Sequence, residues 1–278
     1  MKVIILTGAS SGIGKAAALR LAELGYHVFA GVRREKDADA WKAVPRSIPL
    51  IIDVTKEETV DAAAQQIREV LKKADEVSLV NNAGIAVAGP VEGVSMLKWR
   101  EQFEVNVFGL VKVTQAFLPH IRATRGRIIN ISSVSGLATS PYLGPYSASK
   151  FAVEAISDAL RRELLPFGVK VIVLEPGPIA TPIWEKNLGK KEVLLAELPK
   201  HLHPVYGRAL EKFQRGAEQS AKSAVSVDHT TRAIERALLA KKPPTRIVVG
   251  SKGLGAQMKI FGFMPDRAVD FLIAKAFR

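Results

Sequence analysis

Tyr146 and Lys150, four positions apart, are residue types that could transfer a proton together. They follow a loop from Pro141 to Pro145 and precede an apolar-periodic segment, Phe151 to Leu165, which we expect to be a helix. Residues four apart on a helix share one face. A phenol normally loses its proton near pH ~10. A neighbouring ammonium group would lower the pKa of Tyr146, so the pair could act as a general acid or base near neutrality. Taken alone, the pair also fits a surface helix start with a solvated lysine.

Composition limits the alternatives. The chain has 278 residues, 47% of them hydrophobic and 24% charged, which is typical of a soluble globular protein with one large domain or two small ones. It contains no Cys, which excludes disulfides, thiolate catalysis and Cys-based metal sites. Its five His form no ligand pattern with carboxylates, so we expect no metal.

The net charge of +13 indicates attraction to anions, for example a phosphorylated cofactor. The basic residues are spread along the chain without a recognition motif, so we do not expect nucleic-acid binding. The first apolar run, Val3 to Leu6, is too short for a signal peptide, and no later uncharged run has the length of a membrane span. These features predict a cytoplasmic protein.

A glycine-rich segment connects the first predicted strand, Val3 to Leu6, to a helical pattern from Ala16 to Leu24. Gly8, Gly12 and Gly14 would let the backbone turn tightly and approach phosphates, and the helix N-terminus would supply free N–H groups. The alternative is a tight strand–helix turn without a ligand, but spacing and context together favour a nucleotide site.

The second predicted strand, Tyr26 to Val32, ends in Arg33-Arg34. In nucleotide folds an acidic residue here holds the ribose 2′-hydroxyl of NAD, whereas a basic one can pair with a 2′-phosphate. Arg33 therefore favours NADP, with NAD as the alternative, and Ser11 is a second candidate phosphate partner. Arg33 and Arg34 could also merely lie on a solvated loop.

Further strands are predicted at 48–52, 77–80, 127–131, 169–174 and 246–249, alternating with helices at 56–71, 99–121 and 151–165. This alternation predicts one doubly wound α/β domain, a seven-stranded parallel sheet with helices on both faces. Ligands bind at the carboxyl edge of such sheets, so the candidate residues should converge there. Asp53 would either cap the following helix or accept from an adenine amino group. Asn106, inside a predicted helix, would need a specific partner if buried.

These features together resemble the short-chain dehydrogenase/reductase family over nearly the whole chain. The matching positions are the glycine segment after Thr7, Asp53, residues 81–84 (Asn-Asn-Ala-Gly), Asn106, Ser133, Tyr146 with Lys150, and Pro176-Gly177 with Thr181. Residues 158–170 are similar to the hydroxysteroid and retinol dehydrogenase branch.

The resemblance implies a role for each position. Tyr146 would exchange the proton, Ser133 would bind the substrate oxygen, Lys150 would lower the pKa of Tyr146 and bind the nicotinamide ribose, and Asn106 would hold a water linked to Lys150. The residues that would cradle the pyrophosphate are Gly8, Ser11, Gly12, Ile13 and Gly14. The remaining implied cofactor contacts are Arg33, Asp53, Val54, Asn81, Ala83, Gly84, Pro176, Gly177, Ile179 and Thr181.

Two segments lie outside this pattern. Residues from about 182 to 226 form an apolar insertion that we expect to cover the substrate as a lid, with Ile183, Trp184 and Leu188 among its apolar residues. The extension 251–278 mixes apolar and basic residues. It could lie on a membrane surface, but we favour packing on the body or on another subunit because Pro265 interrupts the pattern. The family resemblance implies a homodimer or homotetramer.

The predicted function is an NAD(P)-dependent oxidoreductase that interconverts a hydrophobic alcohol and its ketone or aldehyde, with a steroid, a retinoid or a long-chain compound as substrate. A non-catalytic NADP-binding sensor or scaffold is the alternative, and the presence of Ser133, Tyr146, Lys150 and Asn106 favours the enzyme. An epimerase or dehydratase fits the glycine spacing and chain length less well.

Overall fold

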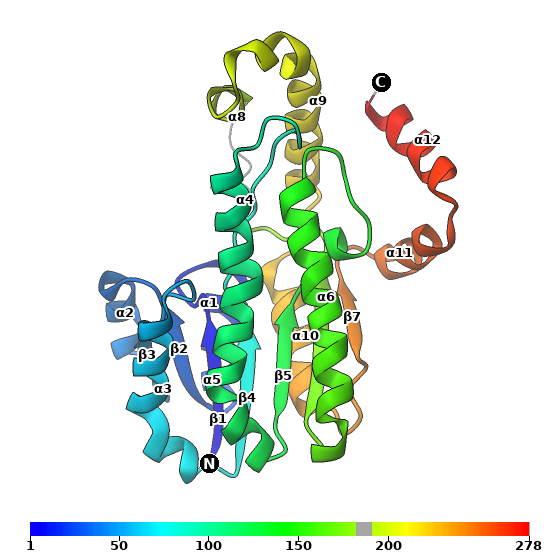
Figure 1. Cartoon of the computed structure of the whole chain (residues 1–278). Helices are drawn as coiled ribbons and strands as arrows, with labels where there is room; N and C mark the ends of the chain where they lie inside the picture. The colour runs from blue at the N-terminus through cyan, green and yellow to red at the C-terminus, as the bar shows by residue number, and fades with distance from the viewer. Residues whose placement is uncertain (182–190, 278) are drawn as a thin grey trace.

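A seven-stranded parallel sheet forms the centre of the computed structural model, which describes residues 1–181 and 191–277. The strand order is β3-β2-β1-β4-β5-β6-β7 (Figure 1). The strands are β1 (Lys2–Thr7), β2 (His27–Val32), β3 (Ser47–Ile51), β4 (Glu76–Asn81), β5 (Arg127–Ile131), β6 (Lys170–Pro176) and β7 (Arg246–Val249). All seven predicted strands are confirmed, each within two residues of its expected bounds.

Helices cover both faces of the sheet (Figure 1). One face carries α1 (Gly12–Glu23), α2 (Glu35–Lys42) and α10 (Val227–Leu239). The other carries α3 (Glu57–Lys72), α5 (Gly109–Ala123) and α6 (Gly144–Leu164). Neighbouring strand residues point to opposite faces, so Ile4 packs in the first layer and Ile5 in the second. Both layers are apolar, which is why the central strands are continuous hydrophobic runs.

The helix predicted at 99–121 is longer than expected and interrupted. It consists of α4 (Met96–Phe103), a π-helical turn η1 (Glu104–Phe108) and α5. Asn106 lies inside the π-helical turn. Such single turns interrupt the regular i→i−4 hydrogen bonds of an α-helix, and they often occur at functional sites.

The insertion after Thr181 is helical in its described part: α8 (Lys191–Ala196), η4 (Lys200–Leu202) and α9 (His203–Lys222). These elements lie beyond the carboxyl ends of the strands (Figure 1). Their apolar side chains form a third cluster with the body; its buried members are Ala88, Leu143, Leu194, Leu198, Leu210 and Phe213. The predicted apolar residues Ile183, Trp184 and Leu188 lie outside the described residues.

The C-terminal extension forms α11 (Leu254–Phe263) and α12 (Asp266–Phe277), which project away from the sheet (Figure 1). From 251 to 275, no residue is buried. The extension therefore packs only loosely on the body, and its predicted alternative, packing on another subunit, stays a prediction. Two short 3-10 turns, η2 (Val134–Gly136) and η3 (Leu165–Phe167), complete the described fold. Among the described helices, none has the length and apolar character needed to cross a bilayer.

Candidate functional site

A cavity of about 850 Å³ opens at the carboxyl edge of the sheet. It extends across the point where the strand order reverses, between β1 and β4, which is where ligands bind in doubly wound sheets. Sixteen of the predicted site residues line it: Gly8, Ser11, Gly12, Ile13, Arg33, Asp53, Val54, Ala83, Gly84, Ser133, Tyr146, Lys150, Pro176, Gly177, Ile179 and Thr181. Three others, Gly14, Asn81 and Asn106, lie outside the lining.

The turn between β1 and α1 is shaped to receive an anion. Gly8 has a positive φ of 72°, and a Cβ at Gly14 would lie 2.2 Å from the carbonyl oxygen of Gly8. Gly14 is therefore required for helix α1 to pack closely on the turn, rather than for cavity contact. Ser11 occupies the N-cap position of α1, but its hydroxyl does not cap the helix, and the first turn carries no acidic residue. The N–H groups of that turn can therefore bind a phosphate.

Asn81 does not reach the cavity, although we predicted it to contact the cofactor. Its buried amide nitrogen donates to Thr114 Oγ1 and to Asn130 Oδ1, both at 2.9 Å, so its side chain links β4 to β5 and α5. The next residue, Asn82, lines the cavity instead and donates to the carbonyl oxygens of Thr7 and Gly8, at 2.9 and 3.2 Å. Neighbouring side chains alternate between the two sides of an extended segment, so only one of these two amides faces the cavity.

Arg33 lies exposed at the end of β2, on the cavity wall. It forms no ion pair with a carboxylate in the described part of the chain. Its neighbour Arg34 also lines the cavity, but its guanidinium group makes two hydrogen bonds to Asp37, at 2.9 and 3.1 Å. Those bonds hold the pKa of Asp37 below its usual range. Arg33 is thus the free cation at this position. The sequence alone did not show which of the two arginines would be unpaired.

Lys56, not Asp53, occupies the N-cap position of α3, so the capping role predicted for Asp53 is wrong. Asp53 Oδ1 accepts from the backbone N–H of Thr55 at 3.1 Å and from the Thr55 hydroxyl at 2.7 Å, an arrangement that shapes the turn before α3. Asp53 also lines the cavity. Its second carboxylate oxygen makes no hydrogen bond to any residue in the described ranges, so it can accept from a ligand.

Ser133, Tyr146 and Lys150 meet at the other end of the cavity. Helix α6 begins at Gly144, so Tyr146 and Lys150 lie on consecutive turns of one helix, as predicted. The Ser133 hydroxyl accepts from the backbone N–H of Ser135 at 3.1 Å and lies close enough to the phenol to lower its pKa. Lys150 is buried, and its Nζ donates to the carbonyl oxygen of Ile131 at 2.8 Å.

The predicted effect of Lys150 on Tyr146 is wrong for this arrangement of side chains. Burial raises the pKa of Tyr146 above its ordinary value, and only the hydrogen bond with Ser133 opposes this. The Lys150 ammonium lies 5.7 Å from the centre of the phenol ring, turned toward Ile131. Lys150 is itself desolvated, and burial lowers its pKa to about 8, with Glu154 opposing.

Asn106 has the specific partners that we expected for a buried Asn in a helix. Its Oδ1 accepts from Ile85 N at 2.9 Å, and its Nδ2 donates to Ile85 O at 3.0 Å and to Ser149 Oγ at 3.1 Å. Both amide hydrogens are thereby used, and Asn106 contacts the neighbour of Lys150 rather than Lys150. Its predicted role as a water holder stays a prediction.

Gln102, which the motif comparison did not include, performs the same task one turn earlier. This fully buried side chain accepts from Val87 N at 2.7 Å and donates to Ile85 O at 3.0 Å and Ser149 Oγ at 3.2 Å. The spacing of four residues from Asn106 is the signal that could have indicated it.

A buried charged cluster extends from Lys150 toward β7. Glu154, one turn after Lys150 on α6, pairs with Arg246 at 3.0 Å, and Glu175 on β6 approaches the same guanidinium at 3.4 Å. Burial and the nearby Glu154 raise the pKa of Glu175 to about 7. One oxygen of each glutamate is buried without a hydrogen bond. No sequence motif pointed to this cluster.

Helix α9 supplies one wall of the cavity near Tyr146, through Phe213, Gly216, Ala217 and Ser220. Leu143 lines the same end from the loop before α6. We expected the insertion to cover the site, but these residues were not singled out, because nothing in the sequence fixes how α9 is rotated.

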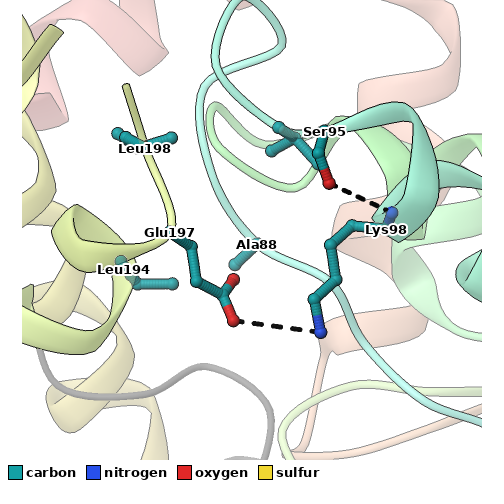
Figure 2. A pocket seen from close by; sticks show the side chains of 7 residues that line it. Ala88, Ser95, Lys98, Leu194, Glu197 and Leu198 are labelled. Atoms are coloured by element: carbon teal, nitrogen blue, oxygen red, sulfur yellow. Dashed lines mark hydrogen bonds and ion pairs between the residues drawn. The ribbon is translucent and has the colours of Figure 1, made fainter. Parts of the chain in front are cut away.

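A second, smaller cavity of about 140 Å³ lies between α4 and the insertion (Figure 2). At its rim Lys98 pairs with Glu197 at 3.8 Å, and the Ser95 hydroxyl accepts from Lys98 N at 3.3 Å as the N-cap of α4. Beside it, Tyr206 donates to Glu92 at 2.5 Å. None of the predicted site residues lines this cavity, which marks where the insertion attaches to the body.

Comparison with known proteins agrees with this geometry. The family model described as short chain dehydrogenase matches residues 2–192. The NADPH-dependent 3-dehydrocapnine reductase of Ornithobacterium rhinotracheale is 38% identical, over 99% of this chain and 97% of that protein. Human retinol dehydrogenase 16 is 37% identical, over 98% of this chain and 87% of that protein. The crystal structure of a short chain dehydrogenase from Burkholderia cenocepacia in complex with NADP superposes with a TM-score of 0.69, at 27% identity, over 95% of this chain and 100% of the other. The chain therefore belongs to the short-chain dehydrogenase family, within which it resembles the retinol dehydrogenase-like branch.

Proposed function

We propose that this protein is an NADP-dependent oxidoreductase that interconverts a hydrophobic alcohol and the corresponding ketone or aldehyde. The observation that carries the proposal is one continuous cavity with an anion-binding turn at one end and Ser133, Tyr146 and Lys150 at the other. That arrangement can hold a dinucleotide across the sheet edge and bring its reactive end to a proton donor.

The residues at the adenosine end suit NADP. Arg33 is a free cation where a 2′-phosphate would lie, the α1 turn can receive the pyrophosphate, and Asp53 has an unused oxygen for the adenine. The names of the relatives support the same cofactor, since one is an NADPH-dependent reductase and one solved structure is an NADP complex. When bound, NADPH would supply the hydride.

The protein's own task is then to position the substrate oxygen and transfer a proton. Ser133 would bind the substrate oxygen next to the phenol, and Tyr146 would give that oxygen its proton as negative charge develops. Burial raises the pKa of Tyr146, which favours the protonated phenol that this step requires. Lys150 would hold the ribose of the cofactor and offer positive charge close to the site.

The substrate end carries apolar side chains, which support a hydrophobic substrate. Leu143 and Phe213 line it, and the side chains of α8 and α9 form the third hydrophobic cluster above it. The elements α8 to α9 would serve as the cover that excludes water during reduction. Assembly as a homodimer or homotetramer and a cytoplasmic location remain predictions.

Replacing Tyr146 by Phe tests the mechanism. The variant should bind NADPH as tightly as the wild type and lose most turnover, about 100-fold or more, because general acid catalysis contributes at least that factor. The screen would use hydrophobic ketones and aldehydes with NADPH, and the matching alcohols with NADP. Full turnover by the variant would overturn the mechanism. NADPH binding without turnover of any compound in wild type would instead favour the sensor alternative.

The cofactor preference is tested by comparing two adjacent arginines. Arg33→Ala should weaken NADPH binding and leave NADH binding nearly unchanged, since only NADPH carries the 2′-phosphate. Arg34→Ala is the matched control, because the Arg34 guanidinium is engaged with Asp37. Equal losses in both variants, or a wild type that does not distinguish the cofactors, would contradict the role given to Arg33.

A further inference from the structure

Helices α11 and α12 carry a large apolar surface that the described part of the chain leaves uncovered. Ile260, Phe263 and Phe271 are 62%, 90% and 68% exposed. Helix α11 is apolar almost all round, and a helix of that kind is normally buried in a core or a membrane. Here none of its residues is buried. An apolar surface of this kind marks an interaction site.

Basic residues accompany the exposed aromatic side chains at one-turn spacing. Lys259 lies four residues before Phe263, and Phe271 lies four residues after Arg267 and four before Lys275. Side chains four apart stack along one face of a helix, so each exposed phenyl ring has a cation beside it. Within the described ranges, neither Lys252 nor any of these three cations forms an ion pair. This combination of phenyl rings with unpaired cations fits the boundary between acyl chains and anionic headgroups.

The uncovered surface of α11 and α12 could face a bilayer or a second copy of the chain, and its charge favours the bilayer. Residues 251–278 contain five Lys or Arg and two Asp, and the whole chain carries a net charge of +13. Two copies meeting through this surface would bring like charges together, whereas an anionic bilayer would neutralise them. We propose that α11 and α12 dock this protein on the surface of a bilayer that contains anionic lipids.

The docking surface is anchored beside the cavity. Leu254, at the start of α11, packs against Gly177 and Gly250; a Cβ at these positions would lie 2.5 and 2.3 Å from Leu254 Cδ2. Gly177 lines the cavity, and α12 approaches α9, which forms the cavity wall. Docking through α11 and α12 would therefore bring the lipid surface close to the substrate end, without a membrane-spanning helix.

Vesicle flotation of the full-length protein tests this proposal. Wild type should float with vesicles of phosphatidylcholine and phosphatidylglycerol, bind vesicles of phosphatidylcholine alone much less, and lose binding as salt is raised. The double substitution Phe263→Ser, Phe271→Ser should weaken binding about tenfold or more, because it removes the two aromatic side chains that would insert into the bilayer. Its matched control is Leu165→Ser with Leu239→Ser, which removes exposed apolar side chains elsewhere and should bind like wild type.

A second pair of variants isolates the charge. Lys259→Gln with Arg267→Gln should reduce binding to the anionic vesicles, whereas Lys73→Gln with Arg232→Gln removes the same charge elsewhere and should not. Circular dichroism and the unfolding temperature verify that each variant is folded. Equal binding to neutral and anionic vesicles, or equal losses in target and control pairs, would overturn the proposal. So would a phenylalanine variant that leaves vesicle binding intact but converts a dimer into a monomer in light scattering, since the surface would then be a subunit interface.

Discussion

At the scale of single residues, burial is the largest cause of the pKa shifts of both Tyr146 and Lys150. Tyr146 and Lys150 lie on one helix face as their spacing predicts, yet desolvation raises the pKa of the phenol and lowers that of the amine. Both shifts favour the neutral form of the group. Spacing predicts which side chains are neighbours, whereas the rotamer of Lys150 and its solvent exposure depend on the packed protein.

Glu154 should tune the ionisation of Lys150. Burial lowers the pKa of Lys150 to about 8, and Glu154 opposes this, so Glu154→Gln should lower that pKa further. If protonated Lys150 supports turnover, the loss of activity at alkaline pH should begin at lower pH in the variant. A shift of one unit would reduce the protonated fraction at pH 8 roughly fivefold. The pH profile of NADPH-dependent reduction is the measurement.

Asp158→Asn is the control for that experiment. Asp158 contacts the same Arg246 at 3.0 Å but lies one helical turn further from Lys150. An unchanged alkaline limb in Glu154→Gln, or an equal displacement in Asp158→Asn, would show that Glu154 does not act on Lys150.

Glu175 should make the protein less stable as pH rises. Burial raises its pKa from 4.5 to about 7, so the folded state holds a proton that the unfolded state has lost between these values. The free energy of unfolding should therefore fall across that range, by roughly 3 kcal/mol at most. Glu175→Gln removes the titration and should flatten the curve in urea unfolding measured from pH 4 to 8. Glu163→Gln, on the exposed end of α6, should keep the wild-type slope; a wild-type slope in Glu175→Gln would contradict the assignment.

At the scale of elements, the strands and most site positions could be predicted from the sequence. Apolar runs ending in Gly, Asn, Ser or Arg fix the strand ends, and parallel topology brings those ends to one edge. The π-helical turn at Glu104–Phe108 and the rotation of α9 could not be predicted, since both depend on contacts between elements. Asn81 and Asn82 show the same limit: the motif located the pair, but which amide faces the cavity depends on strand pleating.

The interrupted helix α4–η1–α5 should act as a clamp on the loop at residues 85–87. Gln102→Leu leaves the buried N–H of Val87 without a partner, which should destabilise the protein by roughly 1–3 kcal/mol. Urea unfolding measures the loss, and hydrogen exchange of the Val87 amide should accelerate. Gln66→Leu, on the exposed face of α3, should change stability by about 0.5 kcal/mol or less. Equal effects of the two substitutions would show that Gln102 is not part of a clamp.

At the scale of the whole molecule, the protein divides into a body and an appendage. Two apolar layers on the faces of the sheet and a third cluster beneath the insertion account for the core. The appendage, α11 and α12, contributes no buried residue in its described part. It contacts the body through α11 on β7, where Leu254 packs, and through α12 on α9. From the sequence we favoured packing of this segment on the body or on another subunit, because Pro265 interrupts its pattern. A mixed apolar and basic pattern shows that a face is apolar but not what covers it.

A chain that ends at Gly253 should therefore keep its fold. Removing α11 and α12 deletes exposed apolar surface and little buried area, so the unfolding temperature should fall by no more than about 2–4 °C, the shift expected for 1 kcal/mol in a protein of this size. Differential scanning calorimetry measures the change, and light scattering reports the oligomeric state. Leu254→Ala in the full chain isolates the contact of α11 with Gly177 and Gly250, and should reproduce part of the loss that the truncation causes. A much larger fall in the truncated protein, together with a change in its oligomeric state, would mean that α11 and α12 are covered by a second subunit in solution.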